Sequence, residues 1–315
     1  GIPLKILSII FEAIGGITPF TYANHFWYLQ FSVLFPIALV ISCTGIVIYH
    51  YMQKITNRNF ALIFAVLLSL EPFFLGITRF MHVTGLLAMF SFASVIITIY
   101  YLLNNQRKHL YIFSIITALA MLTKINAIVF WGLNIGFIGL YYLAIKRDIK
   151  KAFIEPAISI LTTIATYIIL WPAMWVAPYN SIRRIIKNGV LKDGFTDNQD
   201  EVIKSILEIK YLYYAEISLY RISGLLTILL VTGIIIYIWK HKQINNYLKN
   251  NKGFLYLLAL TIIYFLVYYT VMSRATKLKD RYITVYIPYL IVLGTFAYYY
   301  LYTYLSVKGK KLLIY

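Results

Sequence analysis

Basic side chains gather in one short stretch near the C-terminal end of the chain. The stretch contains Arg274, Lys277, Lys279 and Arg281, and its only acidic residue is Asp280. Arginine offers phosphate oxygens a planar, bidentate fork, and lysine offers a compact positive charge. We therefore expect an anionic group such as phosphate to bind here. Contact between a solvated loop and lipid headgroups would explain the same charges, so both interpretations stand.

Four more ionisable residues lie inside or beside apolar runs. Arg79 and His82 are three residues apart and would share one face of a continuing helix. Glu71 stands before Pro72 inside an apolar run, where a carboxylate is costly and suggests a functional role. A helix break whose carboxylate is satisfied by a neighbouring Arg or Tyr is the alternative. Lys124, bracketed by apolar residues, has the same two explanations.

A general base would be an outward-facing carboxylate within hydrogen-bond reach of a hydroxyl acceptor. One hydrophilic stretch contains six acidic residues: Asp193, Asp197, Asp200, Glu201, Glu208 and Glu216. Most acidic residues in such a loop are simply solvated, so none of them is assigned to catalysis. No Gly-rich phosphate loop, His-x-x-x-His pair or nucleophile elbow is present. Cys43 is the only cysteine, so no zinc site or disulfide framework is indicated.

The composition shows which kind of protein must position these residues. Hydrophobic residues make up 61% of the 315 residues and charged residues 13%, against roughly 45–50% and about 25% in soluble domains. A water-soluble fold is excluded. The net charge of +18 would suggest nucleic acid in a soluble chain, but the Lys and Arg residues form short clusters between apolar spans. We therefore predict an all-α, polytopic transmembrane helical bundle with no nucleic-acid partner.

About nine apolar segments are long enough to be membrane-spanning helices. They comprise approximately residues 28–49, 60–78, 84–103, 110–122, 127–145, 154–171, 222–239, 254–272 and 283–305. The fourth and fifth segments are short and separated only by Lys124 and its neighbours. This connection is expected to be a tight re-entry or a turn.

The distribution of basic residues between the loops predicts the orientation. One set of loops contains Lys54, Arg58, Arg107, Lys108, Lys146, Arg147, Lys150, Lys151, Lys240, Lys242, Lys249, Lys252, Lys308, Lys310 and Lys311. Against these stand only Asp148 and Glu155, so the positive-inside rule places this set in the cytoplasm. The loops at about 172–221 and 274–281 then face outward.

The N-terminal end is expected to lie outside as well. Residues 1–27 are predicted to be an extracytoplasmic interfacial segment, in which Lys5, Ser8 and Glu12 recur at helical spacing among apolar residues. Residues 28–315 are predicted to form one transmembrane domain. Because the chain begins at Gly1 without a methionine and lacks the features of a signal peptide, we expect an N-terminal truncation.

Several short motifs resemble those of one enzyme family. Trp171-Pro-Ala-Met-Trp-Val-Ala-Pro178, followed by Arg183 and Arg184, resembles the opening of the large outer loop in bacterial and archaeal relatives of protein O-mannosyltransferases, a family that includes aminoarabinose-transferase-like enzymes. The other similar motifs are Glu71-Pro-Phe-Phe-Leu-Gly-Ile-Thr-Arg-Phe-Met-His82, Leu122-Thr-Lys124, Tyr213-Tyr214 with Arg221, and Lys277-Leu-Lys-Asp-Arg-Tyr282 with Pro288 beyond. Their shared order along the chain extends the resemblance from about residue 31 to residue 297.

The resemblance implies a GT-C fold and a polyprenyl-phosphate-sugar donor that enters from the lipid. Six residues would hold the donor phosphate: Arg79, His82, Lys124, Lys277, Lys279 and Arg281. In this family a carboxylate of the first outer loop activates the acceptor hydroxyl; it is expected upstream of Gly1, which leaves Glu71 as a weak substitute. Relatives commonly carry Asp where this chain has Thr84. No metal or cofactor is assigned.

These observations predict a multi-pass cell-membrane glycosyltransferase whose site faces the extracytoplasmic side. Its expected partners are a polyprenyl-phosphate-linked sugar, membrane lipid and an extracytoplasmic acceptor, which would be a protein, a glycan or a lipid. A lipid-linked oligosaccharide flippase or transporter is one alternative, although repeated halves with broken helices are not found. A noncatalytic membrane scaffold is the other alternative.

Overall fold

The computed structural model describes residues 26–79, 83–185, 212–274 and 280–312, with side chains for 34–79, 83–185, 212–274 and 280–302. Within these ranges the chain is helical and contains no strand. The first half comprises α2 (Phe26–Ile55), α3 (Arg58–Leu70), α4 (Pro72–Thr78), α5 (Thr84–Asn104), α6 (Arg107–Thr123), η2 (Ile125–Ala127), α7 (Ile128–Leu140) with η3 (Tyr141–Lys146), and α8 (Ile149–Leu170). The second half comprises α9 (Ala173–Val176), α10 (Pro178–Arg184), α12 (Tyr213–Arg221), α13 (Gly224–Asn250), α14 (Lys252–Arg274), η6 (Asp280–Tyr282) and α15 (Ile283–Leu312).

The predicted all-α, multi-spanning bundle is confirmed, with a difference in the number of spans. Seven helical segments of the described chain are long and apolar enough to cross a membrane, and the bent pair α3 and α4 raises this number to eight. The remaining predicted segment is α6, whose 17 residues extend only about 25 Å. Residues 60–78 were expected to form one helix, but the chain bends by 63° between α3 and α4. Pro72 at the start of α4 explains the break, because the residue before a proline is disfavoured in helical conformation.

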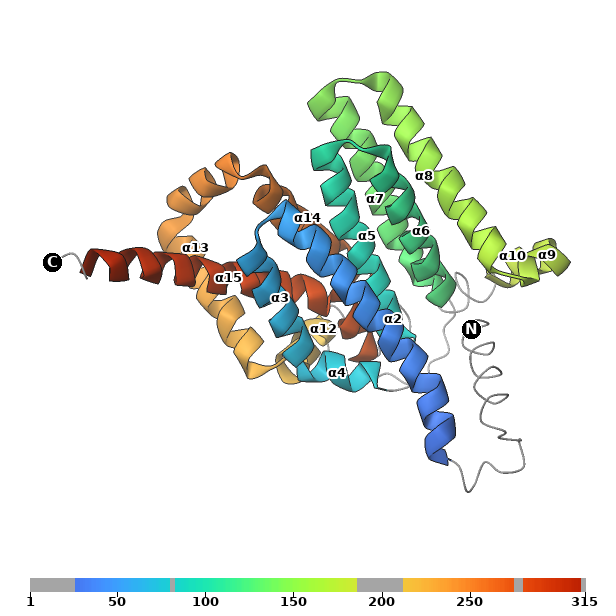
Figure 1. Cartoon of the computed structure of the whole chain (residues 1–315), viewed down its shortest axis with the longest axis horizontal. Coiled ribbons are helices and arrows are strands. Elements are labelled where there is room, and N and C mark those ends of the chain that lie inside the picture. The colour runs from blue at the N-terminus through green and yellow to red at the C-terminus, as the bar shows by residue number, and fades with distance from the viewer. Residues whose placement is uncertain (1–25, 80–82, 186–211, 275–279, 313–315) are drawn as a thin grey trace.

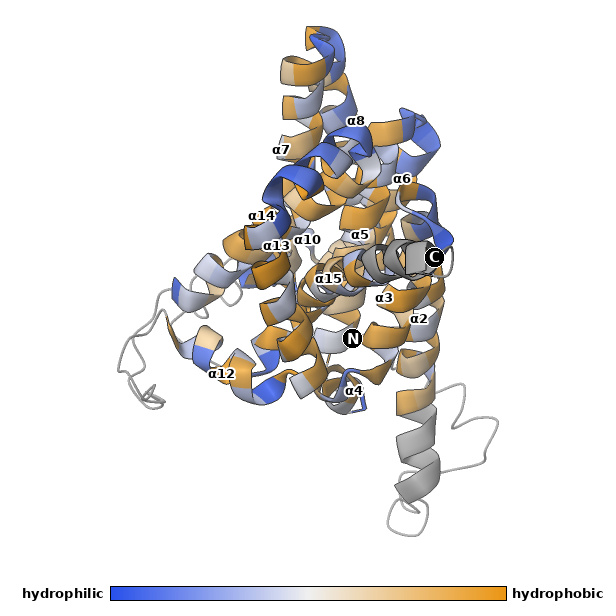
Figure 2. Ribbon diagram, turned by 90° about the vertical axis from the view of Figure 1, so that its left-hand side faces the viewer, coloured by the Kyte–Doolittle hydropathy of each residue, from blue (hydrophilic) through white to orange (hydrophobic). Residues whose placement is uncertain are grey.

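Helix α5 is the centre of the bundle. It packs against α2, α6, α7, α14 and α15, and 17 of its 21 residues are buried. Figure 1 shows α5 to α8 side by side and α15 crossing near α3 and α13. The apolar side chains on the outer faces of α8 and α13 are exposed, including Phe153, Leu161, Ile234 and Ile238. Figure 2 shows the apolar colouring along these helices, as expected for faces in contact with lipid.

Polar residues link the helices inside the bundle. Tyr264 of α14 donates to Asn134 of α7 at 2.5 Å, and Asn134 donates to Ser94 of α5 at 3.2 Å. At the end of the bundle where α5 meets α6, the buried carboxylate of Glu155 accepts from Tyr101 at 3.1 Å and forms an ion pair with Arg107 at 3.0 Å. Such hydrogen bonds hold membrane helices together where the hydrophobic effect gives them no mutual attraction.

Candidate functional site

The break between α3 and α4 places a buried carboxylate at the start of α13. Glu71 is 2% exposed, and its two oxygens accept from the Ser223 backbone N–H at 2.9 Å and the Ser223 hydroxyl at 2.6 Å. The Ser223 hydroxyl also caps α13 by accepting from Leu226 N–H. A carboxylate is favourable beside the positive end of a helix dipole. Glu71 therefore joins two segments that are 152 residues apart.

Its partner corrects one expectation. A neighbouring Arg or Tyr was considered as the group that satisfies Glu71, but the structure shows a serine and a helix N-terminus. The N-cap residue type at position 223, ahead of the apolar run of α13, was a readable signal for the helix start. The contact between Ser223 and Glu71 could not be predicted from the local sequence around either residue.

Side-chain hydrogen bonds hold the short helix α12 against the start of α15. Arg221, the last residue of α12, donates from Nη2 to Asp280 at 2.6 Å, and the Tyr213 hydroxyl donates to the same carboxylate at 3.0 Å. The Ser218 and Tyr286 hydroxyls are 2.7 Å apart. Burial and the hydrogen bond to Asp280 both raise the pKa of Tyr213 well above its usual range. The phenol thus remains a proton donor that holds α12 against α15.

Lys124 and Arg281, two of the predicted phosphate ligands, come from neighbouring segments. The turn after α6 ends that helix at Thr123, and Lys124 is extended before η2 begins. Its Nζ lies 4.2 Å from the centre of the Tyr282 ring, a distance within the range of a cation–π contact. Tyr282 follows Arg281 directly, so the predicted turn at Lys124 is confirmed and lies against the start of α15.

Arg281 has an unused donor at this position. Its Nε is buried and has no hydrogen-bond partner in the described part of the chain. The adjacent acid, Asp280, is engaged by Arg221 and Tyr213, which leaves the Arg281 charge without that counter-ion. Unpaired buried donors are rare and call for an explanation. An anion with several acceptor oxygens would satisfy Arg281.

The other predicted site residues are only partly visible. Arg79 is exposed and follows Thr78, the last residue of α4; its shared face with His82 stays a prediction, because residues 80–82 lie outside the described residues. His82, Lys277 and Lys279 lie outside the described residues. So do the loop acids Asp193, Asp197, Asp200, Glu201 and Glu208, whereas Glu216 is on α12. Thr84 is fully buried at the start of α5.

The described groups in this region are suited to contact with an anion. No cluster of three or more His, Cys, Asp or Glu residues that could hold a metal occurs in the ranges for which coordinates are described. The clustered groups are instead cationic: Lys124 beside Tyr282, and Arg281 with its unused donor. Cations near a protein surface attract a phosphate more strongly than cations in bulk water do, because the effective dielectric constant is lower there.

Comparison with known proteins agrees with this chemistry. The model of the family described as dolichyl-phosphate-mannose-protein mannosyltransferase matches residues 25–175, which covers α2 to α9 and includes Glu71, Arg79 and Lys124. No curated protein matches the chain. The matched family is of GT-C type, and together with the apolar helices it indicates a multi-pass membrane glycosyltransferase.

Proposed function

We propose that this chain, which over residues 25–175 belongs to the dolichyl-phosphate-mannose-protein mannosyltransferase family, transfers a sugar from a polyprenyl-phosphate donor to an extracytoplasmic acceptor. In this proposal, Lys124 and Arg281 bind the donor phosphate. Arg79, His82, Lys277 and Lys279 complete the phosphate site. The acceptor is a protein, a glycan or a lipid.

The observation that carries the proposal is the contact of Lys124 with Tyr282, the residue that follows Arg281. Lys124 lies inside the part of the chain that matches the family, whereas Arg281 lies 106 residues beyond its end at 175. The 4.2 Å contact between Lys124 and the Tyr282 ring supports a site to which both segments contribute. The partnerless Nε of Arg281 supports the binding of an external anion there.

The chemistry of the proposed reaction requires positive charge at this place. When the bond between the sugar carbon and the phosphate oxygen breaks, the electron pair stays on the phosphate, whose negative charge increases. Preorganised cations in a poorly solvated site stabilise this developing charge more than they stabilise the bound donor. Lys124 and Arg281 thus have a role in the transition state as well as in binding.

Glu71 is a poor general base in this arrangement. Both of its oxygens accept hydrogen bonds from Ser223, and the residue is almost completely buried. A base must reach the acceptor hydroxyl directly or through one water. These contacts favour a structural role for Glu71, and the carboxylate expected upstream of Gly1 stays a prediction.

Donor binding in lipid nanodiscs tests the phosphate site without requiring turnover. We expect Arg281→Ala to weaken the binding of dolichyl phosphate by at least about tenfold, since one charge-assisted hydrogen bond contributes about 1.5–3 kcal/mol. Arg184→Ala removes an equally charged, exposed residue from α10 and should leave affinity within about twofold. Equal binding by wild type and Arg281→Ala would exclude the assignment.

A second assay separates the proposed enzyme from its alternatives. Sugar transfer from dolichyl-phosphate-mannose to an added acceptor supports the glycosyltransferase, whereas movement of intact lipid-linked sugar between leaflets supports the flippase. Donor binding without sugar transfer and without movement of lipid-linked sugar between leaflets would favour a noncatalytic scaffold.

A further inference from the structure

Two fully buried tyrosines in the outer half of the bundle have hydroxyl groups without a partner. Tyr268 of α14 is 1% exposed and Tyr289 of α15 is 0% exposed, and neither hydroxyl has a hydrogen-bond partner in the ranges described. Other fully buried tyrosines have hydroxyl partners: Tyr101, Tyr142, Tyr213, Tyr264 and Tyr286. Unsatisfied buried hydroxyls cost free energy, especially in a membrane-embedded core, so these two exceptions require an explanation.

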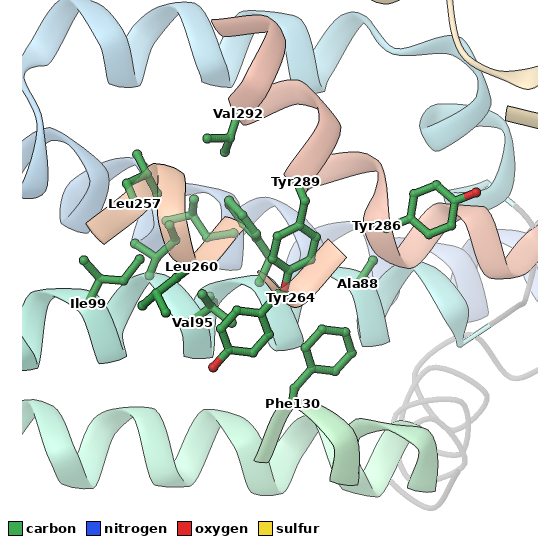
Figure 3. Close-up of a cluster of buried hydrophobic side chains, with 14 of the residues drawn as sticks. Ala88, Val95, Ile99, Phe130, Leu257, Leu260, Tyr264, Tyr286, Tyr289 and Val292 are labelled. Carbon is green, nitrogen blue, oxygen red and sulfur yellow. The ribbon is translucent and has the colours of Figure 1, made fainter. Parts of the chain in front are cut away.

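Both unsatisfied tyrosines contact the same ring. The Phe130 ring of α7 stacks with Tyr268 at 5.2 Å and with Tyr289 at 6.2 Å between centroids. Tyr264 lies in the same group, 6.1 Å from Tyr289, but its hydroxyl donates to Asn134. Figure 3 shows Phe130, Tyr264 and Tyr289 next to one another between the helices. One stack therefore contains a satisfied hydroxyl and two unsatisfied ones.

Two further buried polar atoms without partners in the described residues belong to residues that are adjacent in sequence to rings of this group. The indole Nε1 of Trp131, the residue after Phe130, is buried and unpaired in the described structure, as is the hydroxyl of Ser91. Ser91 precedes Phe92, whose ring is 5.1 Å from Tyr289. Four helices, α5, α7, α14 and α15, thus each contribute an unsatisfied hydrogen-bonding group.

The group lies inward of the proposed phosphate site. Tyr289 is six residues beyond the start of α15 at Ile283, and Tyr268 is six residues before the end of α14 at Arg274. At 1.5 Å per residue, each position is about 9 Å from that end of its helix. A group attached to a phosphate at Arg281 and directed into the bundle would approach them.

We propose that Tyr268, Tyr289 and Trp131 bind the sugar of the polyprenyl-phosphate donor through its hydroxyl groups. The inference rests on the proposed function, because it takes the phosphate to be held at Arg281 and Lys124. A sugar presents several hydroxyls that both donate and accept, which matches phenol and indole groups on different helices. Phe130 fixes the two phenol rings, and Ser91 supplies a further hydroxyl. A site built to hydrogen-bond a substrate hydroxyl discriminates strongly against ligands that lack it.

Tyrosine-to-phenylalanine variants test the stability side of this inference. Because the Tyr268 and Tyr289 hydroxyls have no partner among the described residues, Tyr268→Phe and Tyr289→Phe should leave the thermal unfolding midpoint unchanged or raise it. Tyr264→Phe is the matched control from the same stack, and it should lower the midpoint because it breaks the bond to Asn134. A clear loss of stability in both Tyr268→Phe and Tyr289→Phe would show that the hydroxyls have a structural role and would overturn the proposal.

Paired ligands test the binding side and separate the two proposals. In nanodiscs, Tyr268→Phe and Tyr289→Phe should each weaken dolichyl-phosphate-mannose by about tenfold and leave dolichyl phosphate, which lacks the sugar, unaffected. Tyr264→Phe should leave the ratio of the two affinities unchanged. An unchanged ratio in the Tyr268→Phe, Tyr289→Phe double variant overturns the sugar site, whereas dolichyl phosphate binding that is insensitive to Arg281→Ala overturns the proposed function instead.

Discussion

Arg221 and Asp280 form an ion pair at 2.6 Å that joins the end of α12 to the start of α15. Asp280 also accepts from Tyr213, so the carboxylate holds both ends of α12. Asp280 is the residue before Arg281. Its ion pair with Arg221 means that this neighbouring acid does not serve as the counter-ion of Arg281. Its geometry thus stabilises the site and leaves Arg281 available for an external anion.

Asp280→Asn should lower stability only slightly. The two side chains are 50% and 33% exposed, and ion pairs of such exposure typically contribute about 0–1 kcal/mol. We expect a double-mutant cycle of Asp280→Asn with Arg221→Met, measured by thermal unfolding in detergent, to give a coupling of about 0.2–1 kcal/mol. Lys151→Met, which breaks a longer and comparably exposed pair of 3.6 Å, should have almost no effect. A zero coupling for Arg221 and Asp280 would contradict the proposed stabilisation of α12.

Lys124→Met should weaken dolichyl phosphate binding by about tenfold, equivalent to about 1.4 kcal/mol, because it removes one of the two proposed phosphate cations. Lys124→Arg keeps the charge and should retain most of the affinity. Lys108→Met removes an exposed lysine from the first turn of α6, at its opposite end, and serves as the control. Equal losses in the methionine and arginine variants would indicate that the turn at Lys124, rather than its charge, is needed.

Glu71→Ala should lower stability by about 1–3 kcal/mol, because it leaves two buried donors of Ser223 unpaired. Ser223→Ala should also lower the free energy of unfolding, because it removes one of the same hydrogen bonds. The double variant should be destabilised by less than the sum of the two single variants. Thermal unfolding measures these differences. If Glu71→Gln instead abolished sugar transfer while preserving the unfolding midpoint and donor binding, Glu71 would be the catalytic carboxylate after all.

The sequence was sufficient to predict most of the long apolar helices and the residue types of the candidate site, but not the contacts between distant segments. Lys124 and Arg281 stood out as cations at apolar boundaries, which is a local property. The partnership of Glu71 with Ser223 and of Arg221 with Asp280 depends on how α12 and α13 pack back onto α3 and α15. The helix break before α4 could be predicted from Pro72. The lack of hydrogen-bond partners for the Tyr268 and Tyr289 hydroxyls in the described residues could not be predicted, because it depends on tertiary contacts.

Arg107→Met should destabilise the chain more than other changes at the predicted cytoplasmic end. It removes the charged partner of Glu155, whose side chain is 3% exposed, and leaves a buried carboxylate without its cation, which is destabilising. The remaining hydrogen bond from Tyr101 and the 57% exposure of Arg107 make this loss smaller than it would be for a pair buried on both sides. Lys150→Met, at an exposed position nearby in α8, is the control in the same thermal assay.

The two ends of α8 should be accessible from opposite sides of the membrane. The helix has 22 residues and is about 33 Å long, enough to cross a hydrocarbon core of about 30 Å. The excess of basic residues before Ile149 predicts that this end is cytoplasmic, which would place α9, α10 and the start of α12 outside.

Cysteine labelling in intact cells measures this orientation. In a Cys43→Ser background, which removes the chain's only cysteine, we expect Arg184→Cys on α10 to react with a membrane-impermeant maleimide. Lys150→Cys should react only after the membrane is permeabilised. Both positions are exposed, so a difference in labelling reports their side of the membrane rather than burial. The reverse pattern would place Arg281 and Lys124 in the cytoplasm and exclude an extracytoplasmic acceptor.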